Sequence, residues 1–178
     1  AVQVIGTNGK GSTATFLHSL ALAHGFRAGL YTSPHLVSPA ERIRMMRRLL
    51  PENAWPNLAN RALEAEPALT YFELLTVMAA LAFCDAEPDL LIFEAGLGGR
   101  YDATSALPLD IACFVPIGLD HMHVLGPDVA SIAADKADAL RASMIGALSA
   151  PQEDDAWRAL ERKARMLDLP LYDVSGTR

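Results

Sequence analysis

The sequence has little of what several protein classes require. It contains only two cysteines, Cys84 and Cys113, among 178 residues. They form neither a metal-binding spacing nor a disulfide framework, which is typical of a protein from a reducing compartment. No stretch approaches the roughly 20 apolar residues that cross a membrane, and no basic-then-apolar signal segment opens the chain. We therefore expect a cytoplasmic protein with no membrane partner.

Positive charge is also scarce. The 15 lysines and arginines are outnumbered by 21 aspartates and glutamates, which gives a formal net charge of -6. Binding nucleic acid requires a basic face, so we expect no nucleic-acid partner. Hydrophobic residues make up 51% of the chain, and a chain of this size can bury about 70% of its unfolded surface. The composition predicts one globular domain.

Short apolar runs alternate with helical patterns along the chain. The patterns predict strands at Val2–Ile5, Arg27–Tyr31, Leu90–Phe93, Ile111–Ile117 and Leu169–Val174, and helices at Ser12–His24, Tyr71–Cys84, Val129–Arg141 and Asp154–Leu167. These strands are apolar runs rather than alternating ones, which is typical of a parallel sheet covered on both faces. The sequence thus predicts an α/β fold with three layers, α/β/α, and a mostly parallel sheet.

Two stretches give a weaker pattern. Residues 40–68 are ambiguous, and we interpret their arginines as a solvated helix face, with a phosphate or acidic-substrate contact as the alternative. These arginines are Arg42, Arg44, Arg47 and Arg48. Residues 142–153 are the most linker-like part of the chain.

Glycines gather around one lysine near the start of the chain. The segment GTNGKGS, residues 6–12, follows an apolar strand and precedes a helix. In that order the loop N–H groups and the helix start form a cradle for phosphate. Lys10 would reach the terminal phosphates, and Ser12 a magnesium ion or a phosphate oxygen. Gly11 separates Lys10 from Ser12, unlike the usual P-loop; a glycine-rich turn with an exposed lysine is the alternative.

Glu94 stands at the carboxyl end of an apolar strand. Open parallel sheets bind ligands at that edge, and a carboxylate there is a hard oxygen ligand for Mg²⁺. The alternative is an exposed carboxylate with no ligand.

Five segments together resemble the folylpolyglutamate synthase/dihydrofolate synthase family of the Mur ligase superfamily. They are GTNGKGS, YTSPHLVSPAERIRM, LTYFELLT, LLIFEAGLGGRYDATS and IGLDHMHVLGPDVASIAADKADALR. The resemblance covers nearly all of residues 2–141, with Ser105 where the family usually has Asn and Asp135 where Glu is common. It implies that residues 1–178 form an ATP-binding domain of the Mur ligase central-domain type. It also implies that a C-terminal glutamate-ligase domain is absent from this chain, which alone would bind without turnover.

The resemblance implies an ATP-dependent ligase that forms C–N bonds. It would add L-glutamate to dihydropteroate or to a reduced folate such as tetrahydrofolate, in folate biosynthesis and polyglutamylation. ATP would activate the acceptor carboxylate as an acyl phosphate, which the amine of glutamate then attacks. Charge builds on the transferring phosphoryl group, so two magnesium ions and Lys10 should dominate the catalysis. We expect the protein to be a monomer.

The same resemblance assigns roles to individual residues. The ATP-binding residues would be Thr7, Asn8, Gly9, Lys10, Gly11 and Ser12. The magnesium ligands would be Ser33, Glu94 and His121. Lys136 would be carbamylated, and it would be catalytic together with Lys10 and His121. Dihydropteroate would contact Thr70, Tyr71, Phe72, Glu73, Tyr101, Asp102 and Ala103.

Simpler interpretations stand beside several of these roles. Ser33 can stabilise a turn, and Asp102 can cap its own loop. Tyr71 and Phe72 can be a packing pair at a helix start. Lys136 can be an ordinary solvated lysine, whereas carbamylation needs a lowered pKa because CO₂ adds to the neutral amine.

The remaining histidines have less support. His18, His24 and His123 have no functional context, and His35 lies in a matched segment but has no assigned role.

Three other functions fit parts of the pattern. They are a Mur-type ligase with another acyl substrate, a P-loop kinase or NTPase switch, and a nucleotide-binding module without turnover. The joint occurrence of the five segments favours the folate ligase, and TYFE favours a dihydropteroate site and hence a bifunctional enzyme.

Overall fold

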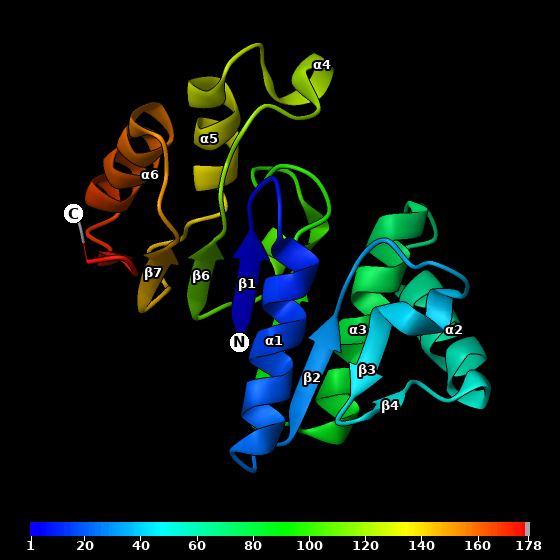
Figure 1. Ribbon diagram of the computed structural model, residues 1–178. Helices are drawn as coiled ribbons and strands as arrows, with labels where there is room; N and C mark the ends of the chain where they lie inside the picture. The colour runs from blue at the N-terminus through cyan, green and yellow to red at the C-terminus, as the bar shows by residue number, and fades with distance from the viewer. Residues whose placement is uncertain (177–178) are drawn as a thin grey trace.

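A computed structural model, which describes residues 1–176, places the strands in one eight-stranded sheet with helices on both faces (Figure 1). The strand order is β4-β3-β2-β5-β1-β6-β7-β8. The strands are β1 (Val2–Ile5), β2 (Ala28–Tyr31), β3 (Ile43–Met45), β4 (Arg48–Leu49), β5 (Leu90–Glu94), β6 (Ile111–Phe114), β7 (Gly146–Ser149) and β8 (Leu171–Asp173). The domain range 1–178 expected from the sequence extends two residues, 177–178, beyond the described part.

Six α-helices and three 3₁₀ helices connect the strands within residues 1–176. The α-helices are α1 (Lys10–Ala23), α2 (Trp55–Ala65), α3 (Tyr71–Ala86), α4 (Met122–Leu125), α5 (Val129–Ala137) and α6 (Asp154–Met166). The 3₁₀ helices are η1 (Pro39–Arg42), η2 (Glu52–Ala54) and η3 (Ala103–Ala106). None of the helices in this part of the chain has the length and apolar character that a membrane crossing needs.

The sheet is mostly parallel, as predicted. Strands β2, β5, β1, β6, β7 and β8 run parallel to their neighbours, whereas β3 and β4 are antiparallel additions beside β2. Parallel strands bring their carboxyl ends to one edge, which is the upper edge in Figure 1. The loops that follow β1, β2, β5 and β6 therefore meet there.

The core lies in two layers, one on each face of the sheet. On one face Val4, Leu30 and Ile92 pack against Ala14 of α1. On the other face Ile5, Phe93 and their neighbours pack against α3, α5 and α6, while α2 packs on α3. This arrangement confirms the predicted three layers.

The prediction of a linker at residues 142–153 is wrong. This stretch contains β7, which pairs with β6 so that Ala147 lies beside Ala112. The strand reads Gly-Ala-Leu-Ser and lacks the β-branched and aromatic residues that usually mark a strand. Its small side chains let α6 pack close, with Ala147, Ala156 and Ala164 in one buried cluster.

The arginines of residues 42–48 do not form a helix face either. Arg42 ends η1 and is buried, Arg44 lies in β3, and Arg48 lies in β4. The β3–β4 hairpin forms because β3 pairs with β2, Arg44 lying beside Leu30. Side chains in a strand alternate between its two faces, so these residues show no helical period. Two predicted ends also shift: the strand from Ile111 ends at Phe114, and the helix from Val129 ends at Ala137.

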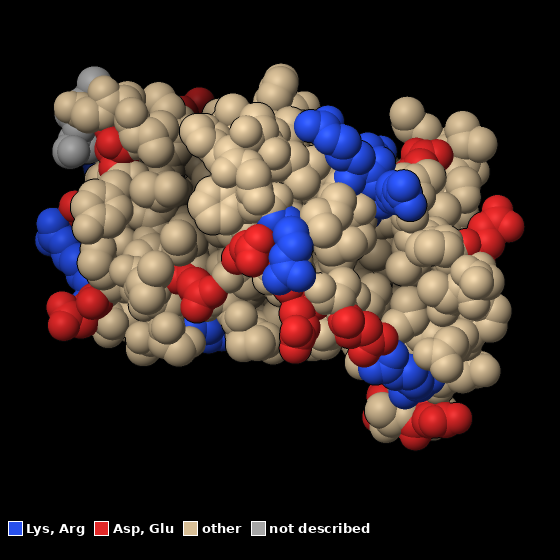
Figure 2. Space-filling model, turned by 90° about the horizontal axis from the view of Figure 1, so that it is seen from below, with Lys and Arg blue, Asp and Glu red and all other residues tan. Residues whose placement is uncertain are grey.

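The edge of the sheet opposite these loops is a charged surface of mixed sign. Seen from below, it carries acidic and basic side chains next to one another at several places (Figure 2). Arg27 pairs with Asp89, and Arg61 pairs with Asp85. The features that single out a ligand site lie at the upper edge instead.

Candidate active site

The loop between β1 and α1 is tied closely to the end of β6. A Cβ atom on Gly6 would lie 2.3 Å from a methyl carbon of Val115, so only glycine fits there. The amides of Thr7 and Asn8 donate to the carbonyl of Pro116, at 3.0 and 3.4 Å. Gly9 caps α1 in a left-handed conformation, with φ of 89°, that glycine adopts without strain. Packing and chain reversal thus explain these two glycines.

The helix start that follows is electropositive. Helix α1, described over its whole length, has no acidic residue in its first turn and no side-chain cap. Its first N–H groups and the positive end of its dipole are therefore available to an anion. The Lys10 ammonium lies over the same loop and donates to the carbonyls of Gly6 and Thr7, each at 3.1 Å.

A buried carboxylate faces this helix start. Glu94 ends β5 and is only 4% exposed. Burial raises the pKa of its carboxyl group, although the Ser33 amide, which donates to Oε2 at 2.9 Å, and the charge of Lys10 act in the opposite direction. Both carboxylate oxygens lie 3.3 Å from the point that a Cβ atom of Gly11 would occupy. The alternative of an exposed strand-end carboxylate is wrong.

One cavity of about 400 Å³ unites these groups. Its lining includes all of the predicted nucleotide-binding residues, namely Thr7, Asn8, Gly9, Lys10, Gly11 and Ser12, together with the three predicted metal ligands, Ser33, Glu94 and His121. The structure thus brings together two sets of residues that were predicted separately.

His121 approaches the cavity from the loop after β6. It caps the short helix α4 with φ of 48°, and its side chain is half-exposed. Its Nε2 lies 3.6 Å from a carboxylate oxygen of Asp120. His123, for which no role was predicted, has its ring centroid 6.2 Å from that of His121.

The side chains Ser33, Glu94 and His121 suit magnesium only if phosphate oxygens supply further ligands. Within residues 1–176, no group of three or more His, Cys, Asp or Glu side chains is arranged to hold a metal ion. Mg²⁺ often binds through one or two carboxylates plus substrate phosphates and water, rather than in an all-protein cage. A buried carboxylate beside a cradle for phosphate fits that mode.

Lys136 is buried on α5 and is only 4% exposed, so it is not a solvated lysine. Burial, helped by repulsion from Lys10, lowers the pKa of its ammonium to about 8. Gly99 packs against the backbone of Lys136, where any Cβ atom would clash with the Lys136 carbonyl oxygen at 2.5 Å.

A larger cavity of about 880 Å³ adjoins the first, because both are lined by Ser33, Pro34 and Gly96. It contains all but one of the residues predicted to contact a pterin: Thr70, Phe72, Glu73, Tyr101, Asp102 and Ala103. Tyr71 does not line it; Tyr71 borders a small apolar pocket with Pro39 and Trp55, and the Arg42 guanidinium lies 5.7 Å from its ring.

The start of α3 forms one wall of the larger cavity. Thr70 and Glu73 cap the helix reciprocally: the Thr70 amide and hydroxyl donate to Glu73 Oε2 at 2.7 and 2.6 Å. The Phe72 ring fills the space beside Gly96, where a Cβ atom would lie 2.6 Å away. These contacts fix Phe72 as a rigid aromatic face.

Asp102 caps its own loop, which was the simpler of its two interpretations. It is buried and accepts from the amides of Gly96, Leu97 and Thr104 at 2.8, 2.9 and 3.0 Å, and also from the Thr104 hydroxyl. Gln3 of β1 in turn donates to that hydroxyl oxygen at 2.7 Å. Sequence reasoning missed Gln3, whose only signal was a lone polar residue inside an apolar strand.

Glu41 was also missed. The Glu41 carboxylate accepts from the amides of Leu36, Val37 and Ser38 at 2.8–2.9 Å, which lowers its pKa to about 2. It thereby shapes the loop that carries Ser33. The spacing from Ser38 to Glu41 matches a capping box and was the available signal.

Arg42, for which an acidic-substrate or phosphate contact was the alternative to a solvated helix face, lines the larger cavity and gives His35 a structural partner. Its Nε donates to His35 Nδ1 at 2.9 Å.

The chain was compared with known proteins. No protein-family model matches it. Folylpolyglutamate synthase from Arabidopsis thaliana is 38% identical over 182 aligned residues, which cover 97% of this chain and 32% of that relative. Dihydrofolate synthase/folylpolyglutamate synthase from Escherichia coli (strain K12) is 44% identical over 154 residues, 84% of this chain and 36% of the relative.

A solved structure agrees with these relatives. E. coli FolC in complex with DHPP and ADP matches with a TM-score of 0.89 at 37% identity, covering 97% of this chain and 41% of that one. The chain spans about a third of the length of the curated relatives it matches.

Proposed function

We propose that this chain, which belongs to the folylpolyglutamate synthase/dihydrofolate synthase family, takes part in an ATP-dependent reaction. The reaction joins L-glutamate to dihydropteroate or to a reduced folate. One observation carries this proposal. The cavity around the glycine loop and the larger cavity beside Phe72 share a boundary at Ser33, Pro34 and Gly96. An acceptor bound in the larger cavity would place its carboxylate at that boundary. The carboxylate would then lie next to the terminal phosphate of a nucleotide bound in the cavity around the glycine loop.

The nucleotide side depends on the loop and Lys10. The first N–H groups of α1 would bind phosphate oxygens. The Lys10 ammonium would exchange its two carbonyl partners, on Gly6 and Thr7, for phosphate oxygens, which are stronger acceptors because they are charged. Ser12 borders the same cavity and offers a further hydroxyl.

The cation side depends on Ser33, Glu94 and His121. When bound, magnesium would neutralise the charge that builds up on the transferring phosphoryl group. Glu94 is the principal ligand in this proposal, because a buried carboxylate gains most from a nearby cation. His121 and a carbamylated Lys136 would hold a second ion.

The burial of Lys136 supports its carbamylation. With a pKa of about 8, about a fifth of the amine is neutral near pH 7.4, against about one in a thousand for an ordinary lysine. CO₂ adds only to the neutral form. Carbon-13 NMR of the protein in labelled bicarbonate should show one carbamate signal that Lys136→Arg abolishes; a spectrum without that signal would remove this role.

The acceptor side is the larger cavity. The flat face of Phe72 suits a pterin ring, with Thr70, Glu73, Tyr101 and Ala103 around it, while Asp102 holds the loop in place. The acceptor carboxylate attacks the terminal phosphorus and ADP leaves. The amine of L-glutamate then attacks the acyl carbon, inorganic phosphate leaves, and the amine loses a proton. We further propose that the protein is a cytoplasmic monomer.

The test is ADP release from Mg·ATP, measured with each reactant omitted in turn. We expect release only when L-glutamate and either dihydropteroate or tetrahydrofolate are both present, with the two acceptors competing. Release without glutamate would point to a kinase or NTPase. A requirement for glutamate with neither acceptor effective would point to another acyl substrate. Binding of Mg·ATP without turnover would point to a nucleotide-binding module.

A further inference from the structure

The glycine loop of residues 96–100 lies flush against α5. Gly98 has φ of 69°, and a Cβ atom on it would lie 2.3 Å from Asp135 Oδ1. A Cβ atom on Gly99 would lie 2.8 Å from the Cα of Lys136. Both glycines are therefore needed for the loop to approach the helix so closely.

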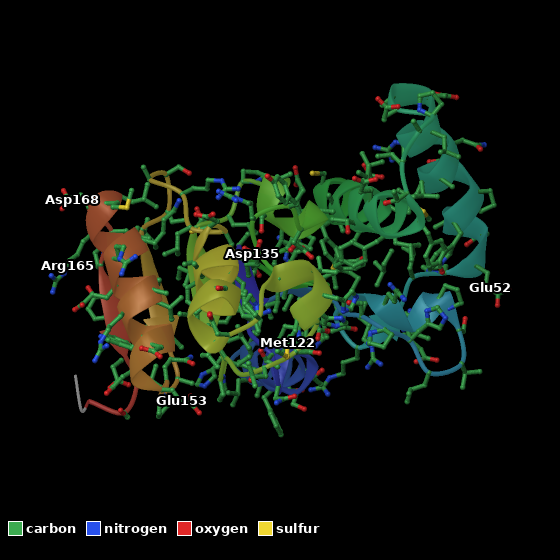
Figure 3. The ribbon with its side chains drawn as sticks, turned by 90° about the horizontal axis from the view of Figure 1, so that it is seen from above. Glu52, Met122, Asp135, Glu153, Arg165 and Asp168 are labelled. Carbon is green, nitrogen blue, oxygen red and sulfur yellow. The ribbon has the colours of Figure 1, made fainter. Side chains whose placement is uncertain are left out.

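One side chain holds the loop in this position. The Gly99 amide donates to Asp135 Oδ1 at 2.9 Å. Asp102, the other carboxylate that binds the loop, contacts only Gly96, Leu97 and Thr104, all within six residues of itself. The bond from Gly99 to Asp135 instead crosses to another element. Figure 3, which looks down onto this edge, shows Asp135 on the side of α5 that faces away from α6.

A second connection between the loop and α5 is weaker. Arg100 Nε lies 3.0 Å from Asp138 Oδ2, but the arginine is 57% exposed and Asp138 is shared with Lys163. Exposed ion pairs contribute little because water screens them and because the side chains lose freedom. Asp135, which is half-buried, makes the better-defined contact.

We propose that Asp135 is a positioning residue for the acceptor: it fixes the glycine loop on α5, so that the wall of the larger cavity and the Lys136 amine keep one relative position. The proposal rests on the proposed function for the identity of the acceptor. Asp135 and the loop residues Gly96, Leu97 and Arg100 all line the larger cavity, while Lys136 is the next residue of the helix. The cradle for phosphate does not touch Asp135, so nucleotide binding should be independent of it.

The acceptor oxygen matters more than the charge. Asparagine keeps an acceptor oxygen at the same place, and alanine removes it. Glutamate, which is common at this position in the family that the sequence resembles, also keeps an acceptor and should hold the loop. Asp128→Ala is the matched control, because Asp128 caps the start of α5 by accepting from Ser131 at 2.7 Å and does not touch the loop.

The experiment compares wild type with Asp135→Asn, Asp135→Ala, Asp135→Glu and Asp128→Ala. For each we would measure KM for dihydropteroate, KM for ATP, kcat, and hydrogen exchange at the Gly99 amide. Asp135→Ala should raise KM for dihydropteroate about tenfold and speed Gly99 exchange by at least as much, the effect of losing one hydrogen bond. KM for ATP should stay within about twofold. Asp135→Asn, Asp135→Glu and Asp128→Ala should behave as wild type in both readouts.

Several outcomes would overturn the proposal. If hydrogen exchange at the Gly99 amide is unchanged in Asp135→Ala, Asp135 does not hold the loop. A parallel rise in KM for ATP would show general damage to the protein instead of a loss of positioning. If the wild-type protein neither binds nor turns over dihydropteroate, the proposed function is wrong, and the positioning role for the acceptor is wrong with it. The exchange readout needs no ligand, so it still decides whether Asp135 holds the loop.

Discussion

Glu94 and Gly11 approach each other so closely that both carboxylate oxygens of Glu94 lie 3.3 Å from the missing Cβ of Gly11. Gly11 is the glycine that separates Lys10 from Ser12. A side chain at this position would force the carboxylate to shift by a few tenths of an ångström. The extra glycine thus lets the first turn of α1 approach the buried carboxylate at the end of β5.

Gly11→Ala should weaken binding of Mg·ATP without harming the fold. Alanine stabilises a helix interior by about 0.5–1 kcal/mol relative to glycine, so the free energy of unfolding should stay constant or rise. Displacement of Glu94 should raise the Kd for Mg·ATP about tenfold. Titration calorimetry and urea unfolding measure the two quantities. Thr15→Ala, at an exposed position of the same helix, is the control, and Gly11→Ala binding as tightly as wild type would contradict this reasoning.

Lys136→Met should be more stable than wild type at neutral pH, by on the order of 2 kcal/mol. The folded protein lowers the pKa of Lys136 from 10.5 to about 8. Below pH 8 both the folded and the unfolded chain carry the proton, and the whole cost of burying the charge is present. Between pH 8 and 10.5 only the unfolded chain keeps the proton, so the stability of wild type rises with pH.

The difference between the two proteins should therefore shrink over that window. Urea unfolding at several values of pH, in bicarbonate-free buffer, measures it. A constant difference from pH 7 to 10.5 would show that Lys136 does not titrate there.

Asp102→Ala should destabilise the protein by about 2–4 kcal/mol, because it leaves buried N–H donors without an acceptor. A residue that only contacts ligand would cost little stability when removed. The stability of Asp102→Asn should lie between those of wild type and Asp102→Ala, because the NH₂ group of asparagine would face N–H donors on one side. Thermal or urea unfolding without ligand separates the interpretations, with Tyr101→Ala, at an exposed position, as the neighbouring control. No loss of stability in Asp102→Ala would argue against the capping role.

The sequence predicted those features that local pattern encodes. The apolar runs at Val2–Ile5 and Leu90–Phe93 predicted strands with nearly correct ends, and strand ends in a parallel sheet led to Glu94. The β3–β4 hairpin was missed because its strands, of three and two residues, are too short to show a pattern. Strand β7 was missed because Gly146 and Ala147 have low strand propensity, although Ala147 packs in the core with Ala156 and Ala164 of α6.

Within the site, residue type alone could not separate ligand contacts from scaffolding. Asp102, Thr70 and Glu73 are polar residues in matched segments. In the structure, however, Asp102 accepts hydrogen bonds from its own loop, and Thr70 and Glu73 cap a helix. The burial of Lys136 and the bond from Asp135 to Gly99 depend on how α5 meets the loop after β5. Those contacts join residues 36 positions apart and leave no local signature.

The central claim is that the opening loop, with Lys10, gathers the phosphates of Mg·ATP beside Glu94. Titration calorimetry of Mg·ATP into wild type, Lys10→Ala and the control Arg165→Ala, whose arginine is 77% exposed, tests it most directly. We predict saturable binding to wild type and to the control, and binding weaker by about 10–100-fold in Lys10→Ala, the loss of one or two charge-assisted hydrogen bonds. Wild type that fails to bind Mg·ATP, or Lys10→Ala that binds as tightly as wild type, would contradict the account.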